Sequence, residues 1–130
     1  MDTEVEFRSD SFKPILSEEA QVNPECYGFE LAWWLCQQLK QNELETTYPG
    51  FEDWGWFLEY IVDDNEYWLC CSNVIGSKDR WLIYLKRHSK GMFGRNLAPI
   101  EGAHSLLAAL RTAIEGNDEI SEVEWRTAPN

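Results

Sequence analysis

The stretch Trp54–Arg87, WGWFLEYIVDDNEYWLCCSNVIGSKDRWLIYLKR, decides the fold. Three runs within it alternate with a period of two, which is typical of half-buried β-strands. These runs are Trp54–Val62, Glu66–Asn73 and Arg80–Arg87. Asp, Asn and Gly residues, which favour turns, separate the runs at 63–65 and 76–79. Such short links between alternating runs predict a three-strand antiparallel meander.

The meander carries apolar side chains on both faces. Its alternation predicts Trp54, Trp56 and Leu58 on one face and Phe57 on the other. The two helices expected in this chain can cover only one face of the sheet. We therefore expect the other face to expose an aromatic surface, or to be covered by loops or a second subunit.

The residues before the meander predict one strand and one helix. Thr3–Arg8 alternates as a half-exposed strand, and Ser9–Val22 is expected to be a connecting loop. Asn23-Pro24 predicts a helix start, because Asn caps well and Pro fits the first turn, and the helix is expected to run to about Gln41. Its apolar stripe is Tyr27, Leu31, Leu35 and Leu39. Trp33 and Trp34 are adjacent, so we expect one of them at the surface.

The residues after the meander predict a loop, a helix and a closing strand. Ser89–Pro99 reads as a loop, Ile100–Glu115 as a helix and Ser121–Arg126 as a strand with one wet face. The order is then β-α-β-β-β-α-β. The expected fold is α+β: a two-layer sandwich of a mainly antiparallel five-strand sheet with two helices on one face, forming a single domain over 1–130.

Composition excludes several classes of protein. The chain has 130 residues, 14% aromatic, with seven Trp. So aromatic a chain has ample apolar surface to fold, which argues against a disordered tail. No apolar run approaches the roughly 18 residues of a membrane-spanning helix, and no basic-then-apolar leader opens the sequence. We expect a cytoplasmic protein with no membrane contact.

Charge is distributed unevenly along the chain. Met1–Glu66 carries sixteen acids and three bases, whereas Tyr67–Asn130 carries seven acids and eight bases. A negative field repels nucleic acid and steers basic partners inward. Acidity for solubility alone is the simpler interpretation of the same charge.

The sequence offers no recognisable catalytic or metal-binding motif. Cys26, Cys36, Cys70 and Cys71 contain no Cys-x-x-Cys pair, and neighbours on a strand point to opposite faces, so they are expected to be free, buried thiols. His88 and the cysteines lie in no nucleophile motif, and His104 falls in the first turn of a helix. We therefore expect no catalytic residues, no metal and no cofactor.

Two segments are candidate binding sites. In Glu52-Asp53-Trp54-Gly55-Trp56, carboxylates precede tryptophans, a combination that suits a cation, a sugar or an Arg-rich partner, or else simply caps the core. The second segment, Lys86–Arg95, combines Gly91 and Gly94 with basic side chains. Glycine amides and bases together suit an anion or nucleotide, or else the segment is simply a solvated loop. Its bases are Lys86, Arg87, Lys90 and Arg95.

In size, acidity and α+β pattern the chain resembles the small immunity proteins encoded beside bacterial toxins. Its segments Val22–Leu31 and Glu52–Trp56 are also similar in kind to those of uncharacterised bacterial proteins. This resemblance implies tight, stoichiometric binding to a basic toxin or nuclease, and it carries over no functional residue.

The leading hypothesis is a non-enzymatic inhibitor that neutralises a basic protein partner. Acids would set the association rate, and tryptophans would anchor the complex. The partner-binding residues predicted on this basis are Glu43, Glu45, Glu52, Asp53, Trp54, Trp33 and Trp34. The alternatives are a small-ligand module with an aromatic pocket that holds an anion, and a homodimer formed through the uncovered sheet face.

Overall fold

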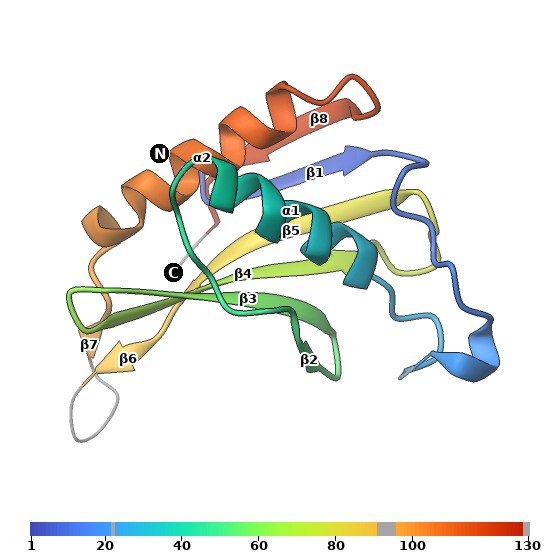
Figure 1. The fold of residues 1–130 in the computed structure, drawn as a ribbon, viewed down its shortest axis with the longest axis horizontal. Helices are drawn as coiled ribbons and strands as arrows, with labels where there is room; N and C mark the ends of the chain where they lie inside the picture. Colours follow the sequence, from blue (N-terminus) through green and yellow to red (C-terminus); the bar gives the residue numbers. More distant parts are fainter. Residues whose placement is uncertain (22, 91–95, 129–130) are drawn as a thin grey trace.

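A computed structural model describes residues 1–21, 23–90 and 96–128, with the Lys90 side chain outside the description. The main sheet has six antiparallel strands in the order β2-β3-β4-β5-β1-β8. Both α-helices lie on one face of it (Figure 1). The elements are β1 (Glu4–Arg8), η1 (Glu18–Ala20), α1 (Phe29–Gln41), β2 (Gly50–Glu52), β3 (Gly55–Val62), β4 (Asn65–Asn73), β5 (Arg80–Arg87), β6 (Ser89–Lys90), β7 (Asn96–Leu97), η2 (Ile100–Ala103), α2 (His104–Glu115) and β8 (Ser121–Arg126).

The predicted α+β class, the antiparallel meander and the placement of both helices on one face are confirmed. The predicted count of five strands is wrong. The sixth strand is β2, which pairs with the start of β3. The predicted loop Ser89–Pro99 also contains β6 and β7, which form a separate two-stranded sheet. Strands of two or three residues are too short to show an alternating pattern in the sequence.

The core lies between the helices and one face of the sheet. The apolar stripe predicted for the first helix is buried there through Leu31, Leu35 and Leu39 of α1, and α2 contributes Leu107, Leu110 and Ile114. The sheet contributes alternate residues from its central strands. These include Val5, Phe7, Leu58, Tyr67, Leu69, Trp81 and Ile83, all fully buried. We call the opposite side, which the helices leave uncovered, the open face.

Helix α1 begins later than the sequence predicts. Its first residue is Phe29, preceded by Gly28 at the cap position, and the predicted start at Asn23-Pro24 is wrong. Asn23 donates its side-chain amide to the Asp53 carbonyl (2.7 Å) instead of capping a helix. Glu25 then takes a left-handed conformation with φ of 62°. The Asn23 side chain therefore attaches this part of the chain to the β2–β3 turn and does not start a helix.

Two glycines bring loops close to the end of β4. Gly28 and Gly55 have φ of 144° and 155°, and a Cβ on either would lie under 3 Å from the Cys71 carbonyl oxygen. Only glycine fits this close approach at positive φ without strain. The chain reverses before β3, so Trp54 lies outside the strand.

That reversal separates the two tryptophans. Trp54 packs beside Tyr84 on the open face, with ring centroids 5.9 Å apart. Trp56 packs on the core side against Phe29 and Phe51. The predicted common face for Trp54 and Trp56 is therefore wrong.

Candidate functional site

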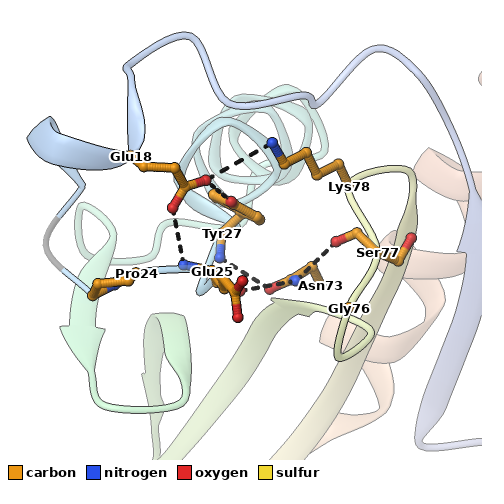
Figure 2. A pocket seen from close by; sticks show the side chains of 8 residues that line it. All are labelled: Glu18, Pro24, Glu25, Tyr27, Asn73, Gly76, Ser77 and Lys78. Carbon is orange, nitrogen blue, oxygen red and sulfur yellow. Dashed lines mark hydrogen bonds and ion pairs between the residues drawn. The ribbon is translucent and has the colours of Figure 1, made fainter.

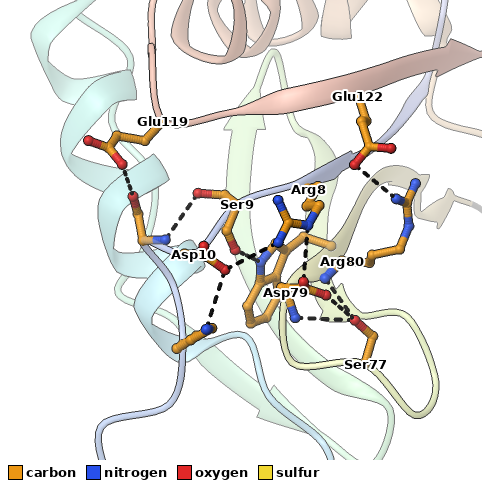
Figure 3. Close-up of polar contacts among 11 residues, drawn as sticks. Arg8, Ser9, Asp10, Ser77, Asp79, Arg80, Glu119 and Glu122 are labelled. Atoms are coloured by element: carbon orange, nitrogen blue, oxygen red, sulfur yellow. Dashed lines mark hydrogen bonds and ion pairs between the residues drawn. The ribbon is translucent and has the colours of Figure 1, made fainter.

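Four arginines neutralise the acids of one side of the molecule. Arg8, Arg80 and Arg126 lie on β1, β5 and β8, Arg111 lies on α2, and each contacts at least two carboxylates. Figure 3 shows part of this set, with Arg8 on Asp79 and Arg80 on Glu122. We call these arginines and their eight carboxylates the arginine network. Its acids are Asp2, Glu4, Glu6, Asp10, Asp79, Glu115, Glu122 and Glu124.

Glu6 is the centre of this network. One of its oxygens accepts from Arg80 (3.1 Å) and the other from Arg126 (3.2 Å). These bonds hold the pKa of Glu6 below its usual range. Hydrogen bonds from Ser77 and Arg8 likewise lower the pKa of Asp79. Four acids of the negative N-terminal half, Asp2, Glu4, Glu6 and Glu18, are paired with an arginine or lysine of the C-terminal half.

Most of the acids that lie in no described ion pair are elsewhere, in residues 25–64, which we call the acidic segment. This segment contains nine acids and a single base, Lys40. All nine lie beyond ion-pair distance of every described Lys, Arg and His side chain. They are Glu25, Glu30, Glu43, Glu45, Glu52, Asp53, Glu59, Asp63 and Asp64. The negative field of the described structure is therefore concentrated on this segment.

Part of the acidic segment borders a hollow of about 640 Å³ on the open face, which we call the acidic hollow. Asp53 and Trp54 from the β2–β3 turn line it together with Leu82 and Tyr84 of β5, and the Trp54 ring packs beside the Tyr84 ring. The remaining lining comes from β1, from the chain before α1, and from the end of β4 and the loop after it. These residues are Glu6, Asn23, Pro24, Glu25, Cys26, Ser72, Asn73, Val74, Ile75 and Gly76.

Asn73, itself buried, holds two walls of the acidic hollow together. Its side-chain oxygen accepts from the Tyr27 amide (2.9 Å), and its nitrogen donates to the carbonyls of Glu25 (3.2 Å) and Ser77 (2.9 Å). Figure 2 shows these bonds from the neighbouring hollow, of about 310 Å³, which shares Pro24, Glu25, Asn73 and Gly76 with the acidic hollow. The loops around the acidic hollow are thus fixed by hydrogen bonds.

The neighbouring hollow is internally paired. Tyr27 donates its hydroxyl to Glu18, and Lys78 lies 3.9 Å from the same carboxylate, as Figure 2 shows. The Lys78 ammonium also lies over the Tyr27 ring, 5.9 Å from its centroid. Because Glu18 and Lys78 already satisfy each other, Glu25 is the one unmatched carboxylate among the described residues that line this hollow, whereas both Glu25 and Asp53 line the acidic hollow.

The predicted partner-binding residues fall into two separate groups. Asp53 and Trp54 line the acidic hollow, and Glu52 precedes them in β2. Trp33, exposed as one of the adjacent pair was expected to be, instead stacks on Tyr48 (5.6 Å, 5° between planes). That stack borders a different hollow, of about 320 Å³, which Glu45 also lines.

Two more predicted partner-binding residues lie near α1. Glu43 is exposed just after α1. Trp34 is half-buried against Phe12, with ring centroids 5.1 Å apart. The structure therefore leaves Trp33, rather than Trp34, as the exposed tryptophan of the pair.

Of the predicted anion-binding residues, the two with described side chains, Lys86 and Arg87, make separate contacts. Lys86 lies over the Trp68 ring on the open face (5.2 Å), whereas Arg87 donates to the Ala98 carbonyl (3.1 Å). Arg95 and the Lys90 side chain lie outside the described residues.

A second aromatic cluster occupies the open face at the other end of the meander. Phe57 stacks on Trp68 (3.6 Å), and the His88 ring lies 4.5 Å from Trp68. His88 Nδ1 lies 3.0 Å from Glu66. Burial, together with hydrogen bonding and repulsion from Glu66, raises the pKa of Glu59. Half-buried aromatic side chains therefore line this end of the open face.

The thiols of Cys26, Cys70 and Cys71 are held in their protonated form. Burial raises the pKa of Cys70 to about 12 and that of Cys71 well above its usual value. Burial and the nearby Asp53 also raise the pKa of Cys26. All four cysteines are free, and the described residues contain no cluster of His, Cys, Asp and Glu able to hold a metal ion. A protonated thiol is a poor nucleophile.

Sequence reasoning found Asp53 and Trp54 but missed the rest of the acidic hollow. Tyr84 and Leu82 come from a strand about thirty residues away, and only the sheet order places them beside Trp54. Ile75 carried a signal: it is a large apolar residue within a turn, and the structure leaves it 99% exposed.

No protein-family model, curated protein or solved structure matches this chain. In the described residues, no helix is long and apolar enough to cross a membrane.

Proposed function

We propose that this chain is a non-enzymatic binding protein that neutralises a basic protein partner, in the manner of an inhibitor or immunity protein acting in the cytoplasm. The observation that carries the proposal is the separation of charge. The arginine network matches the acids around β1 and β8, while the acidic segment keeps nine carboxylates unmatched by described bases.

Unmatched surface charge suits a binding role. Surplus carboxylates on one region steer a basic partner to that region and raise the association rate. Exposed aromatics supply the affinity that exposed charges alone do not. Trp54 lies within the acidic segment and is 37% exposed, as is Trp33. The four free thiols suit the reducing conditions of the cytoplasm.

The test is a pull-down from native cell lysate at about 50 and 500 mM salt, which bracket weak and strong screening. Two variants with equal loss of charge accompany the wild type. The first carries Glu43→Gln, Glu45→Gln, Glu52→Gln and Asp53→Asn. The control carries Glu19→Gln, Glu101→Gln, Asp118→Asn and Glu119→Gln, four exposed acids outside the acidic segment.

We expect the wild type and the control to retain one stoichiometric basic protein, more weakly at high salt, and the first variant to lose it. The partner so identified then permits a rate measurement. Charge reversal by Glu52→Lys and Asp53→Lys should slow association by about tenfold or more at low salt. Absence of a stoichiometric basic partner, or equal loss in both variants, would overturn the proposal.

A further inference from the structure

We infer that the acidic hollow receives an arginine side chain of the basic partner, an inference that rests on the proposed function and adds the place and chemistry of recognition. The acidic hollow is the largest of the described hollows, about 640 Å³, within the usual range for ligand sites. An arginine therefore fits together with parts of the residues beside it.

The carboxylates of the acidic hollow differ in what they already bind. Glu6, on β1, has both oxygens occupied by Arg80 and Arg126. Asp53 and Glu25 have no described cation within ion-pair distance. Free anions are repelled here, and an incoming cation meets Asp53 and Glu25 as its counter-charges.

The Asp53 carboxylate stands on a fixed backbone. Asn23 donates to the Asp53 carbonyl (2.7 Å), and the Cys26 thiol lies 3.6 Å from the same oxygen. Asn73 ties the Glu25 carbonyl to the end of β4. A turn already fixed in the free protein loses little conformational entropy when the partner binds.

The aromatic wall selects the kind of cation. The Trp54 and Tyr84 rings are 5.9 Å apart and inclined at 46°. Burial raises the pKa of Tyr84, so its ring stays neutral and offers a stacking surface rather than a charge. A guanidinium is planar, stacks on aromatic rings and bonds a carboxylate through two nitrogens at once, whereas an ammonium is a compact, strongly hydrated point charge. The wall and the carboxylates together favour arginine over lysine.

The rim favours a protein over a free small molecule. Ile75 is 99% exposed beside the acidic hollow, and Trp54 is 37% exposed. Exposed apolar side chains around a charged site offer contacts to the residues flanking an arginine. The occupant is therefore an arginine with apolar neighbours, presented by the partner's surface.

The test uses three capped peptides, acetyl-Leu-Arg-Leu-amide and its lysine and citrulline counterparts, titrated into the full chain at about 20 mM salt and followed by two-dimensional NMR. Citrulline keeps the shape of arginine without its charge. We expect the arginine peptide to shift the Trp54 indole and the Ile75 amide. The lysine peptide should bind at least about threefold more weakly, and the citrulline peptide about tenfold more weakly.

Variants locate the binding. Asp53→Asn and Trp54→Leu should each weaken the arginine peptide by about fivefold or more, while the matched control Asp118→Asn leaves it unchanged. Both hollow residues are exposed, and the unperturbed remainder of each spectrum verifies the fold. Three outcomes would overturn the inference: no binding, equal binding of citrulline, or shifts centred on Trp33 and Tyr48.

The outcome also separates this inference from the proposed function. If the arginine peptide does not bind while a basic partner is still captured through the acidic segment, the proposed arginine site is wrong and the proposed function is retained. If the arginine peptide binds the acidic hollow but no basic partner is captured, the proposed function falls.

Discussion

Glu6 and Glu59 both lie on the open face of the same sheet, yet their surroundings act on them in opposite directions. Arg80 and Arg126 hold the pKa of Glu6 below its usual range. Burial and the neighbouring Glu66 raise the pKa of Glu59. One belongs to the arginine network and the other to the acidic segment. The difference teaches that this fold uses its arginines to stabilise one side and leaves the other side charged.

The two regions are also held in place differently. Ion pairs join β1, β5 and β8, whereas close backbone packing and uncharged hydrogen bonds hold the start of α1 and the β2–β3 turn against β4. Because its position does not depend on pairing its own charges, the acidic segment remains available to a partner.

The largest expected effect comes from filling the space at Gly28. Gly28→Ala places a Cβ 2.8 Å from the Cys71 carbonyl oxygen at φ of 144°, so we expect a loss of about 3 kcal/mol in unfolding free energy. Urea denaturation measures this loss. The control is Gly76→Ala, whose φ is also positive (82°) but whose Cβ meets no atom within 4 Å, and it should cost about 1 kcal/mol. Equal losses would show that the close packing against β4 does not hold the acidic segment.

Removing Arg126 should have the next largest effect. Arg126→Met leaves Glu4 without its 2.7 Å bond and Glu6 with one arginine instead of two. We expect a loss of about 1–2 kcal/mol at low salt, smaller at 1 M salt because screening weakens the lost attraction. The matched control is Lys40→Met, which removes a base from the acidic segment where no ion pair is described. If both substitutions lower the unfolding free energy equally, the ion pairs of the arginine network make no specific contribution to stability.

Glu6→Gln should make stability depend less on pH in the acid range. The pKa of Glu6 is lowered on folding, so its carboxylate stabilises the fold above its unfolded pKa, and that contribution is lost as pH falls through the folded pKa. We expect the variant to be less stable than wild type by about 1 kcal/mol at pH 7, with the gap closing below about pH 4. Urea melts from pH 3 to pH 7 measure it. A gap that stays constant across this range would contradict the predicted linkage.

Glu59→Gln should have the smallest effect and the opposite sign. A raised pKa means that the contribution of Glu59 to stability is present at low pH and is lost as pH rises through the folded pKa. The variant should therefore be more stable than wild type at pH 7, by a few tenths of a kcal/mol at this largely solvated site. Thermal melts at pH 4 and pH 7, with Glu43→Gln as the exposed control, give the sign. A less stable variant at pH 7 would remove the contrast with Glu6.

The sequence predicted those parts of the fold that depend on the periodic burial of side chains within one helix or strand. The alternation in β3, β4 and β5 and the helix stripes were enough for the α+β class, because periodicity reports which side chains are buried. The helix start predicted at Asn23-Pro24 was wrong, because the Asn23 side-chain amide donates to the carbonyl of Asp53, a residue distant in the sequence. The face predicted for Trp54 was wrong as well, because the positive φ of Gly55 breaks the alternation that placed Trp54 with Trp56.

The candidate site was half predictable for the same reason. The negative charge and the pair Asp53 and Trp54 can be read from composition and adjacency. Neither reveals that Arg80 and Arg126 cross the sheet to Glu6, nor that Tyr84 faces Trp54. Those contacts follow from the strand order, in which β1 lies between β5 and β8.

That strand order also sets a sequence of events in folding. Strands β3, β4 and β5 join neighbours along the chain, whereas pairing Glu4 with Arg126 closes a loop spanning nearly the whole chain. Loop closure costs entropy before its contacts repay it, so the meander should form early and the β1–β8 pair last. Substitutions in the arginine network should then speed unfolding while leaving the folding rate almost unchanged. The same arginines that neutralise one side of the sheet would thus slow unfolding and so lengthen the lifetime of the native state.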